Sequence, residues 1–485
     1  MRDKLRQLSK DTAVYGISTI LSRFLTFILV PFYSHMLGKA DNGIIGAIYA
    51  YIAFLNILYL YGMDTAYLKY ASIYMQEKKK DVFSSPFLSV VFSSAVISML
   101  FYVFRGPVNE VFQLPDRYSY ILNYIVLILF FDALSAVPFA YLRIVRKAKK
   151  FALIKTINIL INVVLNIVLL RMMKMGIEAV FIANLAASVI TMMLLLPDIL
   201  ENFHLRIDKD LFRLMLKFGM PYLPASLASM VIQVIDRPIL LRLTDDATVG
   251  LYQINYKLGI FMMLFVSMFQ YAWQPFFLHN AKESNAKEIF SRVLTWFVLA
   301  GSTVLVMLSL FIEDLVKASI LNVTLIDSRY WSGLSIVPVI LAGYLFNGIY
   351  VNLTAGILIQ EKTKYIPYVT ALGAIVNIAV NFALIPVWGI TGAAMATFLS
   401  YVFMAAGLYL VSRHFYPIDY EYGKLLKILI AVTITAVLYY LFGFTTILLK
   451  ILLVALYSIM IVLFGVVSGE EIKSIKTVFL RRKAA

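Results

Sequence analysis

Stretches of apolar residues about 20 positions long recur from one end of the chain to the other, separated by short polar segments. A helix rises about 1.5 Å per residue, so each stretch can cross the roughly 30 Å hydrocarbon layer of a bilayer. The stretches are continuous rather than alternating, which indicates helices and not the strands of a β-barrel. The pattern therefore predicts an all-α integral membrane protein with about 14 transmembrane helices. These spans are expected over residues 12–36, 43–65, 84–104, 118–142, 151–171, 176–197, 212–241, 249–275, 291–313, 332–359, 365–386, 390–412, 424–443 and 446–468.

Four prolines interrupt the helical pattern of the seventh and tenth spans, at Pro221, Pro224, Pro238 and Pro338. Proline lacks the N–H that a helix interior needs, so breaks or bends are expected there. An even number of spans places both termini on the same side of the membrane.

Composition agrees with the membrane prediction. The chain is 61% hydrophobic and 14% charged, with a mean hydropathy of +0.85, whereas soluble domains carry about 25% charged residues. The net charge of +16 raises nucleic-acid binding as an alternative. However, 31 of the 43 lysines and arginines fall in segments predicted to be cytoplasmic and nine in segments predicted to face outward. The positive-inside rule explains this distribution, so we expect a multi-pass inner (plasma) membrane protein with both termini cytoplasmic and no nucleic-acid partner.

Several classes of chemistry have no sequence support. The 485 residues include no cysteine and only four histidines, which are scattered along the chain. No metal site, cofactor or catalytic cluster is therefore expected, and the absence of a P-loop sequence argues against ATP binding through that motif. The first apolar segment is too long for a signal peptide and is expected to remain as the first span.

The sequence contains an internal repeat. Pro31, Gly43 and Tyr49 recur as Pro238, Gly250 and Tyr256, each 207 positions later, and Ala40 recurs as Ala247. Each copy is expected to be a helix ending near the proline, followed by a short turn and a glycine opening the next helix. Asn162 and Asn166 are echoed by Asn377 and Asn381 at an offset of 215.

Duplicated halves are typical of secondary transporters. With six helices in each half, both halves have the same orientation, and the pseudo-two-fold axis is expected along the membrane normal. The predicted domains are two six-helix lobes followed by a helix pair with a basic cytoplasmic tail, over residues 1–205, 206–415 and 416–485.

The motifs of both halves resemble a known family. The segments that carry the resemblance in the first half are Ser22-Arg23-Phe24, Pro31, Leu37-Gly38-Lys39-Ala40-Asp41-Asn42-Gly43 and Gly62-Met63-Asp64. Those in the second half are Phe218-Gly219-Met220-Pro221, Asp236-Arg237-Pro238, Gly250-Leu251-Tyr252 and Tyr271-Ala272-Trp273-Gln274-Pro275-Phe276-Phe277. Their order and spacing resemble the bacterial oligosaccharide (Wzx-like) flippases of the multidrug/oligosaccharidyl-lipid/polysaccharide (MOP) exporter superfamily.

This resemblance implies a transport function. Such proteins move undecaprenyl-diphosphate-linked oligosaccharide from the cytoplasmic to the periplasmic leaflet by alternating access, for O-antigen, capsule or exopolysaccharide assembly. The expected partners are this lipid-linked oligosaccharide and the phospholipid bilayer, with H⁺ or Na⁺ as a coupling ion left open, and the chain is expected to work as a monomer. A lipid II flippase or a multidrug exporter of the same superfamily is the alternative. A membrane-embedded polysaccharide polymerase fits less well because the outer loops are short, so no enzyme is expected.

Ionisable residues within spans are costly and mark candidate functional positions. Arg23, Arg237 and Lys257 are candidate substrate contacts, because arginine donates two hydrogen bonds to one phosphate group. Asp132 and Asp236 are candidates for ion coupling or for ion pairs, and Arg23 with Asp132 is one such pair. Asp236 and Arg237 are expected to point to different sides of a helix and not to neutralise each other.

Polar stripes of asparagine follow two spans. Asn158, Asn162 and Asn166 repeat every four residues on one span, and Asn377 and Asn381 do so on another. They are candidates for lining a sugar path, with hydrogen bonding between packed helices as the alternative.

Overall fold

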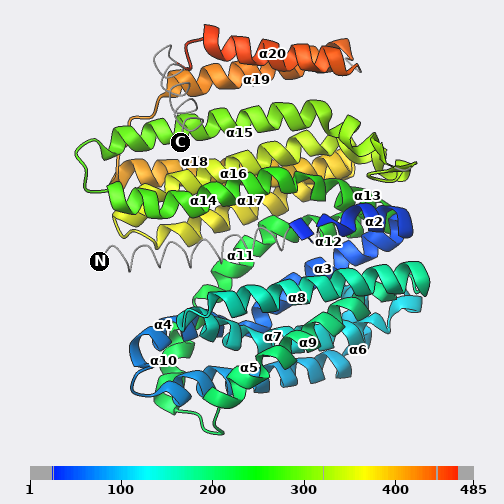
Figure 1. Cartoon of the computed structure of the whole chain (residues 1–485), viewed down its shortest axis with the longest axis vertical. Coiled ribbons are helices and arrows are strands. Elements are labelled where there is room, and N and C mark those ends of the chain that lie inside the picture. The colour runs from blue at the N-terminus through cyan, green and yellow to red at the C-terminus, as the bar shows by residue number, and fades with distance from the viewer. Residues whose placement is uncertain (1–23, 26, 321, 444–445, 468–485) are drawn as a thin grey trace, which may run out of the picture. The chain divides into compact units, whose positions relative to one another are not determined.

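The computed structural model describes residues 24–25, 27–320, 322–443 and 446–467 (Figure 1). These residues are almost entirely helical, apart from a two-stranded antiparallel hairpin of β1 (Ser319–Ile320) and β2 (Val323–Thr324). Within the same residues, 12 helices are long and apolar enough to span a membrane, and Ile447–Leu463 forms a shorter apolar helix. The prediction of an all-α multi-pass membrane protein is confirmed. The first predicted span, 12–36, lies largely outside the described residues.

The remaining predicted spans each fall on an observed helix or helix pair. The helices are α2 (Leu29–Met36), α3 (Lys39–Leu60), α4 (Met63–Tyr74), α5 (Lys79–Val103), α6 (Arg105–Val111), α7 (Ile121–Ile144), α8 (Ala148–Ile167), α9 (Glu178–Asn202), α10 (Lys209–Gly219), α11 (Tyr222–Val234), α12 (Asp236–Leu243), α13 (Asp246–Tyr256), α14 (Ile260–Asn280), α15 (Ala286–Lys317), α16 (Val337–Ile359), α17 (Tyr365–Trp388), α18 (Ile390–Phe415), α19 (Tyr422–Phe442) and α20 (Ile447–Leu463). Single turns of 3₁₀ or π helix occur at η1 (Asp116–Tyr118), η2 (Val168–Met172) and η3 (Lys257–Gly259), and η4 (Ser328–Ile336) is a longer 3₁₀ segment.

Two compact units make up the chain. Of the described residues, the first contains those up to 260 with 326–336 and 367–400, and the second contains those of 261–325, 337–366 and 401–467. In the first unit α7 packs against α5 and α9, and α8 packs against α9. In the second unit α15 packs against α16 and α19, and α19 packs against α20. The domain boundaries predicted after residues 205 and 415 stay a prediction.

Proline breaks the seventh span where the sequence predicts it. The chain leaves α10 at Gly219 and enters α11 just after Pro221, and a second break at Ile235 separates α11 from α12. Pro238 is the third residue of α12, and Pro338 the second residue of α16. In the first turn of a helix the N–H has no intrahelical partner, so proline costs nothing there.

A break in the second span was not predicted. Tyr61 and Gly62 adopt left-handed conformations, with φ of 33° and 80°, and separate α3 from α4. A Cβ on Gly62 would lie 2.5 Å from the carbonyl oxygen of Gly219. Glycine is therefore required both by its backbone conformation and by the close approach of the end of α10.

The helix bounds repeat at the offset seen in the sequence. α12 begins and ends 207 residues after α2, and α13 begins 207 residues after α3. Pro31 and Pro238 lie in the first turns of α2 and α12, and each helix ends five residues later, so a helix does end near each repeated proline. The repeated glycines lie at the fifth position of α3 and α13 rather than opening them.

The repeated glycines meet where α3 crosses α13. A Cβ on Gly43 would lie 1.7 Å from the carbonyl oxygen of Asp246, and a Cβ on Gly250 would lie 1.9 Å from that of Lys39. The two backbones are in direct contact at this point, as small residues at helix crossings allow. Tyr330 of η4 is fully buried beside the crossing, where its hydroxyl accepts a hydrogen bond from Asn42 at 2.8 Å and its carbonyl accepts one from Asn255 at 2.9 Å.

In the second unit a buried charge fixes α20 to α15. The Lys450 ammonium lies 2.5 Å from the Asp314 carboxylate, and the side chains are 3% and 31% exposed, respectively. The hydroxyls of Ser302 and Tyr457 are hydrogen-bonded at 2.8 Å between the same two helices. The final helix is therefore held by polar contacts as well as by apolar packing.

The unequal exposure of this pair predicts unequal mutational effects. Asp314→Ala leaves the buried Lys450 ammonium unpaired and is expected to cost about 3 kcal/mol of unfolding free energy. Lys450→Met leaves a carboxylate that keeps contact with solvent, so the loss should be smaller. Thermal unfolding midpoints of the purified variants measure both effects. Equal losses for the two variants would contradict this explanation.

Candidate functional site

The break between α11 and α12 carries the charges that the sequence singles out. Asp236 and Arg237 form the first two residues of α12 and are only 1% and 5% exposed. The carbonyls at the end of α11 have no partner within that helix, and Pro238 has no N–H to offer them. Polar side chains are therefore needed at this point in the span.

Arg237 supplies hydrogen-bond donors at the break between α11 and α12. Its guanidinium donates from Nη1 to the carbonyl oxygen of Gln233 at 2.5 Å and to the Asp236 carboxylate at 2.7 Å. The Arg237 backbone N–H also donates to the Asp236 carboxylate, at 3.0 Å. The expectation that Asp236 and Arg237 do not neutralise each other is therefore wrong. It assumed an uninterrupted helix, whereas at a helix start the Asp236 side chain folds back over the first turn.

Three residues of α13 complete this cluster, and the sequence interpretation did not identify them as site residues. Arg237 donates from Nε to the Gln253 side-chain oxygen at 2.9 Å, and its guanidinium lies 4.1 Å from the centre of the Tyr256 ring. The Tyr252 hydroxyl donates to the other oxygen of Asp236. A signal for Tyr256 existed, since it belongs to the repeated motif, but nothing in the sequence marks Gln253.

Glycine again provides the space for these contacts. A Cβ on Gly46 would lie 3.0 Å from Cγ of Gln253, so a side chain at position 46 would press on the residue that orients Arg237. Gly46 and Gln253 occupy corresponding positions in the two copies of the repeat.

Lys257 lies next to this cluster. It directly follows α13, is partly exposed, and is close enough to Arg237 for the two positive charges to repel each other. Two cations with one carboxylate give the group a net positive charge. Such a group can bind an anion. An anion that takes the place of the Asp236 carboxylate would accept the hydrogen bonds that Arg237 donates to it.

Asp132 takes part in a different group of polar residues. Its carboxylate accepts a hydrogen bond from the Ser188 hydroxyl at 2.7 Å, between α7 and α9, and Lys155 of α8 acts on it electrostatically. Arg23, the other predicted member of an ion pair with Asp132, lies outside the described residues. The site roles predicted for Arg23, Asp132, Asp236, Arg237 and Lys257 all stay predictions.

The asparagine stripes form hydrogen bonds within and between helices. Asn158 donates to Thr191 on α9 at 2.8 Å, and Asn166 accepts from the Tyr33 hydroxyl at 2.8 Å while donating to Asn162. Asn381 donates to the side chain of Asn377 at 2.9 Å, repeating the Asn166–Asn162 contact. These contacts favour the helix-packing alternative. A path role stays open for Asn377 and Asn381, because among the described residues the Asn377 amide nitrogen and the Asn381 side-chain oxygen are buried without a partner.

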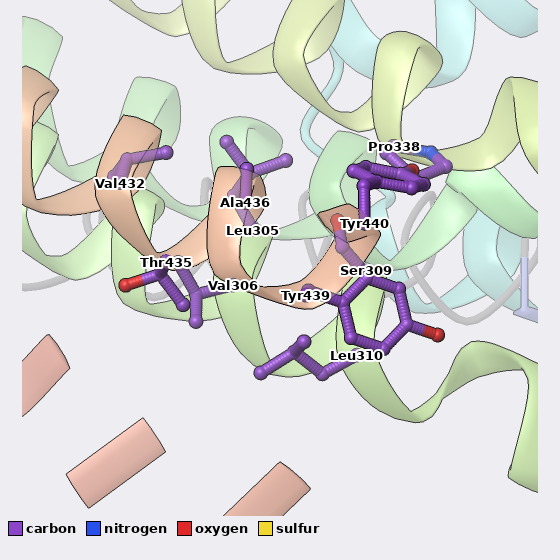
Figure 2. Close-up of a pocket in the computed structure, with 10 residues that line it drawn as sticks. All are labelled: Leu305, Val306, Ser309, Leu310, Pro338, Val432, Thr435, Ala436, Tyr439 and Tyr440. Atoms are coloured by element: carbon purple, nitrogen blue, oxygen red, sulfur yellow. The ribbon is translucent and has the colours of Figure 1, made fainter. Parts of the chain in front are cut away.

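The second unit contains an apolar cavity of about 120 Å³ (Figure 2). Side chains of α15 and α19 line it, including Val306, Ser309, Thr435 and Tyr439, with Pro338 of α16 at its edge. None of the ten described residues that line it is charged. The cavity therefore offers no counter-charge to an anionic group, unlike the cluster around Arg237.

Comparison with known proteins places the chain in a family. Residues 8–281, more than half of the chain, match the family described as polysaccharide biosynthesis protein. The chain belongs to this family. A relative of this chain, described as an uncharacterized membrane protein of Haemophilus influenzae, is 20% identical over 398 residues, which cover 76% of this chain and 94% of the relative.

Solved structures share the fold of this chain. One is the lipid II flippase MurJ in an inward closed conformation, with a TM-score of 0.74 and 18% identity over 93% of this chain and 98% of MurJ. Another is an inward-facing multidrug resistance MATE family transporter of the MOP superfamily, with a TM-score of 0.66 and 10% identity over 81% of this chain and 94% of the transporter. The family match confirms the polysaccharide family that the sequence resemblance indicates, and the solved structures confirm the fold; the Wzx-like subtype stays a prediction.

Proposed function

We propose that this chain is a flippase for undecaprenyl-diphosphate-linked oligosaccharide and moves it from the cytoplasmic to the periplasmic leaflet by alternating access. The product would feed O-antigen, capsule or exopolysaccharide assembly. The proposal includes an inner-membrane location with both termini cytoplasmic, a monomer, a transport rather than an enzymatic role, and H⁺ or Na⁺ as a coupling ion.

The observation that carries the proposal is the net positive cluster of Arg237, Lys257 and Asp236 within a membrane protein of a polysaccharide biosynthesis family. A diphosphate headgroup cannot cross hydrocarbon without counter-charges. Arg237 has the planar donor fork that suits phosphate oxygens, and a nearby lysine adds a second charge. An exporter of cations would be expected to have the opposite balance.

A second candidate function is lipid II transport. The fold likeness to MurJ extends over nearly the whole of both chains, which favours this alternative over other cargoes. Lipid II carries its sugars on a polyprenyl diphosphate as well, so the charge cluster alone does not separate the two functions.

Deletion of the gene in its host tests the proposal. Loss of surface polysaccharide with accumulation of an undecaprenyl-linked repeat unit facing the cytoplasm is the expected result. Transport after rescue with Lys257→Gln should be at least about ten-fold lower than after rescue with the wild type, because a charge contact to the diphosphate is lost. Replacing Lys257 removes a charge that repels Arg237, so protein levels should not fall.

The matched control is Lys282→Gln, which removes the same charge from an exposed position between α14 and α15. It should rescue fully. Unchanged surface polysaccharide and unchanged lipid intermediates after deletion would refute the proposed cargo, and accumulation of lipid II with osmotic lysis would establish the second candidate instead.

A further inference from the structure

α10 presents three cations along one side. Lys209, Arg213 and Lys217 are four residues apart in sequence, so they lie on one face of the helix at intervals of about 6 Å. All three side chains are exposed, and within the described residues none forms an ion pair. We call these three residues the α10 stripe. The single carboxylate of α10, Asp210, acts on Lys78 of the α4–α5 loop.

The opposite side of α10 is fastened to its neighbours in the first unit. Leu211 and Met215 are buried, and Gly219 packs against the backbone of Gly62. At the same end of α10, Lys69 of α4 places its ammonium 3.8 Å from the centre of the Phe218 ring. The stripe is therefore the free side of a fixed helix.

The start of α10 is held as firmly. The Asp208 carboxylate caps the helix by accepting from the Leu211 backbone N–H at 3.1 Å, and it pairs with Lys78 at 2.8 Å. The bond to Lys78 lowers the pKa of Asp208, so the carboxylate stays charged at neutral pH. The Asp208 N–H donates to the hydroxyl of Ser85 at the start of α5. A cationic face held in this way is arranged before any ligand arrives.

The stripe lies within a candidate membrane span. α10 and α11 together form one such span of 26 residues, Lys209–Val234. Lys209 is the first residue of this span, and Lys217 lies eight residues later, about 12 Å along the axis of α10. A cationic side chain within a span requires an anionic partner or a water-filled path.

The same charges recur in the other half of the sequence. At the repeat offset of 207, Lys209, Arg213 and Lys217 correspond to Arg2, Arg6 and Lys10, and Asp210 corresponds to Asp3. Both copies of the repeat thus start with three cations at four-residue spacing. General attraction to the cytoplasmic surface needs positive charge but no fixed spacing, so the recurrence favours a defined ligand.

We infer that the α10 stripe binds the diphosphate of a polyprenyl-linked cargo before that cargo reaches Arg237 and Lys257. This inference rests on the proposed function and adds a loading site to it. Each stripe cation can donate hydrogen bonds to phosphate oxygens, so one diphosphate can be held by two neighbouring cations and passed on to the third. The headgroups of bulk anionic phospholipids share the phosphate chemistry, and the test must separate the two.

The test measures lipid binding to the full-length purified protein by native mass spectrometry. The two probes are undecaprenyl diphosphate and dioleoylphosphatidylglycerol. The stripe variant is Lys209→Gln/Arg213→Gln/Lys217→Gln. The matched control, Lys80→Gln/Lys149→Gln/Lys282→Gln, removes the same charge from exposed positions elsewhere. Thermal unfolding midpoints report on folding, and the single variant Arg213→Gln replaces the triple one should that variant unfold.

We expect undecaprenyl diphosphate to bind at least about ten-fold more weakly to the stripe variant than to the control, with phosphatidylglycerol binding unchanged. A parallel loss for both lipids would overturn the inference, since the stripe would then be a general membrane anchor. Unchanged diphosphate binding by the stripe variant would overturn it too but leave the proposed function standing. A wild-type protein that does not bind undecaprenyl diphosphate would overturn both.

Discussion

Replacing Gly43 with alanine is expected to prevent the first unit from forming its native helix crossing. The added methyl group would lie 1.7 Å from the carbonyl oxygen of Asp246, and a backbone atom cannot turn away as a flexible side chain can. α3 and α13 must therefore separate, at a cost of about 3 kcal/mol or more. We expect little folded protein in the membrane and a lowered unfolding midpoint for what remains. Gly250→Ala should have the same effect, because its methyl group meets Lys39 at 1.9 Å.

A glycine outside this crossing serves as the control. At Gly423 in α19, no atom beyond the neighbouring residues lies within 4 Å of the position that an added methyl group would take, so alanine fits there. Alanine has the higher helix propensity, and Gly423→Ala should be as stable as the wild type or slightly more so. The Gly43→Ala/Gly250→Ala double variant should cost less than the sum of its parts, since helices already separated accept the second methyl. Wild-type stability of Gly43→Ala would disprove the backbone contact.

Removing one member of the Asp236–Arg237 pair should be the most damaging change at the candidate site. Asp236→Leu leaves a guanidinium that is 5% exposed without its carboxylate, and Arg237→Val leaves a buried carboxylate and an unpaired Gln233 carbonyl. Each single variant is expected to lose about 3 to 5 kcal/mol of unfolding free energy. Unfolding in denaturant or by heat, with the purified protein, measures the loss.

The first half of the chain offers the matching control. At the repeat offset, Asp236 and Arg237 correspond to Leu29 and Val30, which are buried in α2. The double variant Asp236→Leu/Arg237→Val therefore carries in α12 the same two residues that occupy the equivalent positions of α2. We expect it to recover most of the stability lost in either single variant and yet to fail in rescuing the deletion strain. Full transport by the folded double variant would remove Arg237 from the proposed diphosphate path.

The features of the fold that depend on the length of the apolar stretches were predictable from the sequence. Each apolar run after the first matches an observed helix or helix pair, and the breaks near Pro221 and Pro238 follow from the missing proline N–H. The break at Tyr61–Gly62 was not predictable, because its cause is contact with Gly219, far along the chain. A glycine inside an apolar run has no local feature that separates a break from a packed helix.

The candidate site shows a second limit of prediction from the sequence. Helical spacing places neighbouring side chains on different faces, and that rule led to the wrong expectation for Asp236 and Arg237. The rule fails at a helix start, where the side chain can bond to its own first turn. Gln253 was missed because a neutral amide within a span is not unusual until its partner, the Arg237 guanidinium, is known to lie beside it.

The contact between Gly43 and Gly250 also has a mechanical consequence. Crossing angles between helices are normally fixed by side-chain ridges that fit into grooves of the partner. At this crossing backbone meets backbone, so no interlocking side chain there resists a change of angle. The angle is instead held by residues further along α3 and α13, where Gln253 meets Gly46 and Tyr330 bonds to Asn42 and Asn255. Any change of the angle between α3 and α13 would have to break or rearrange these contacts.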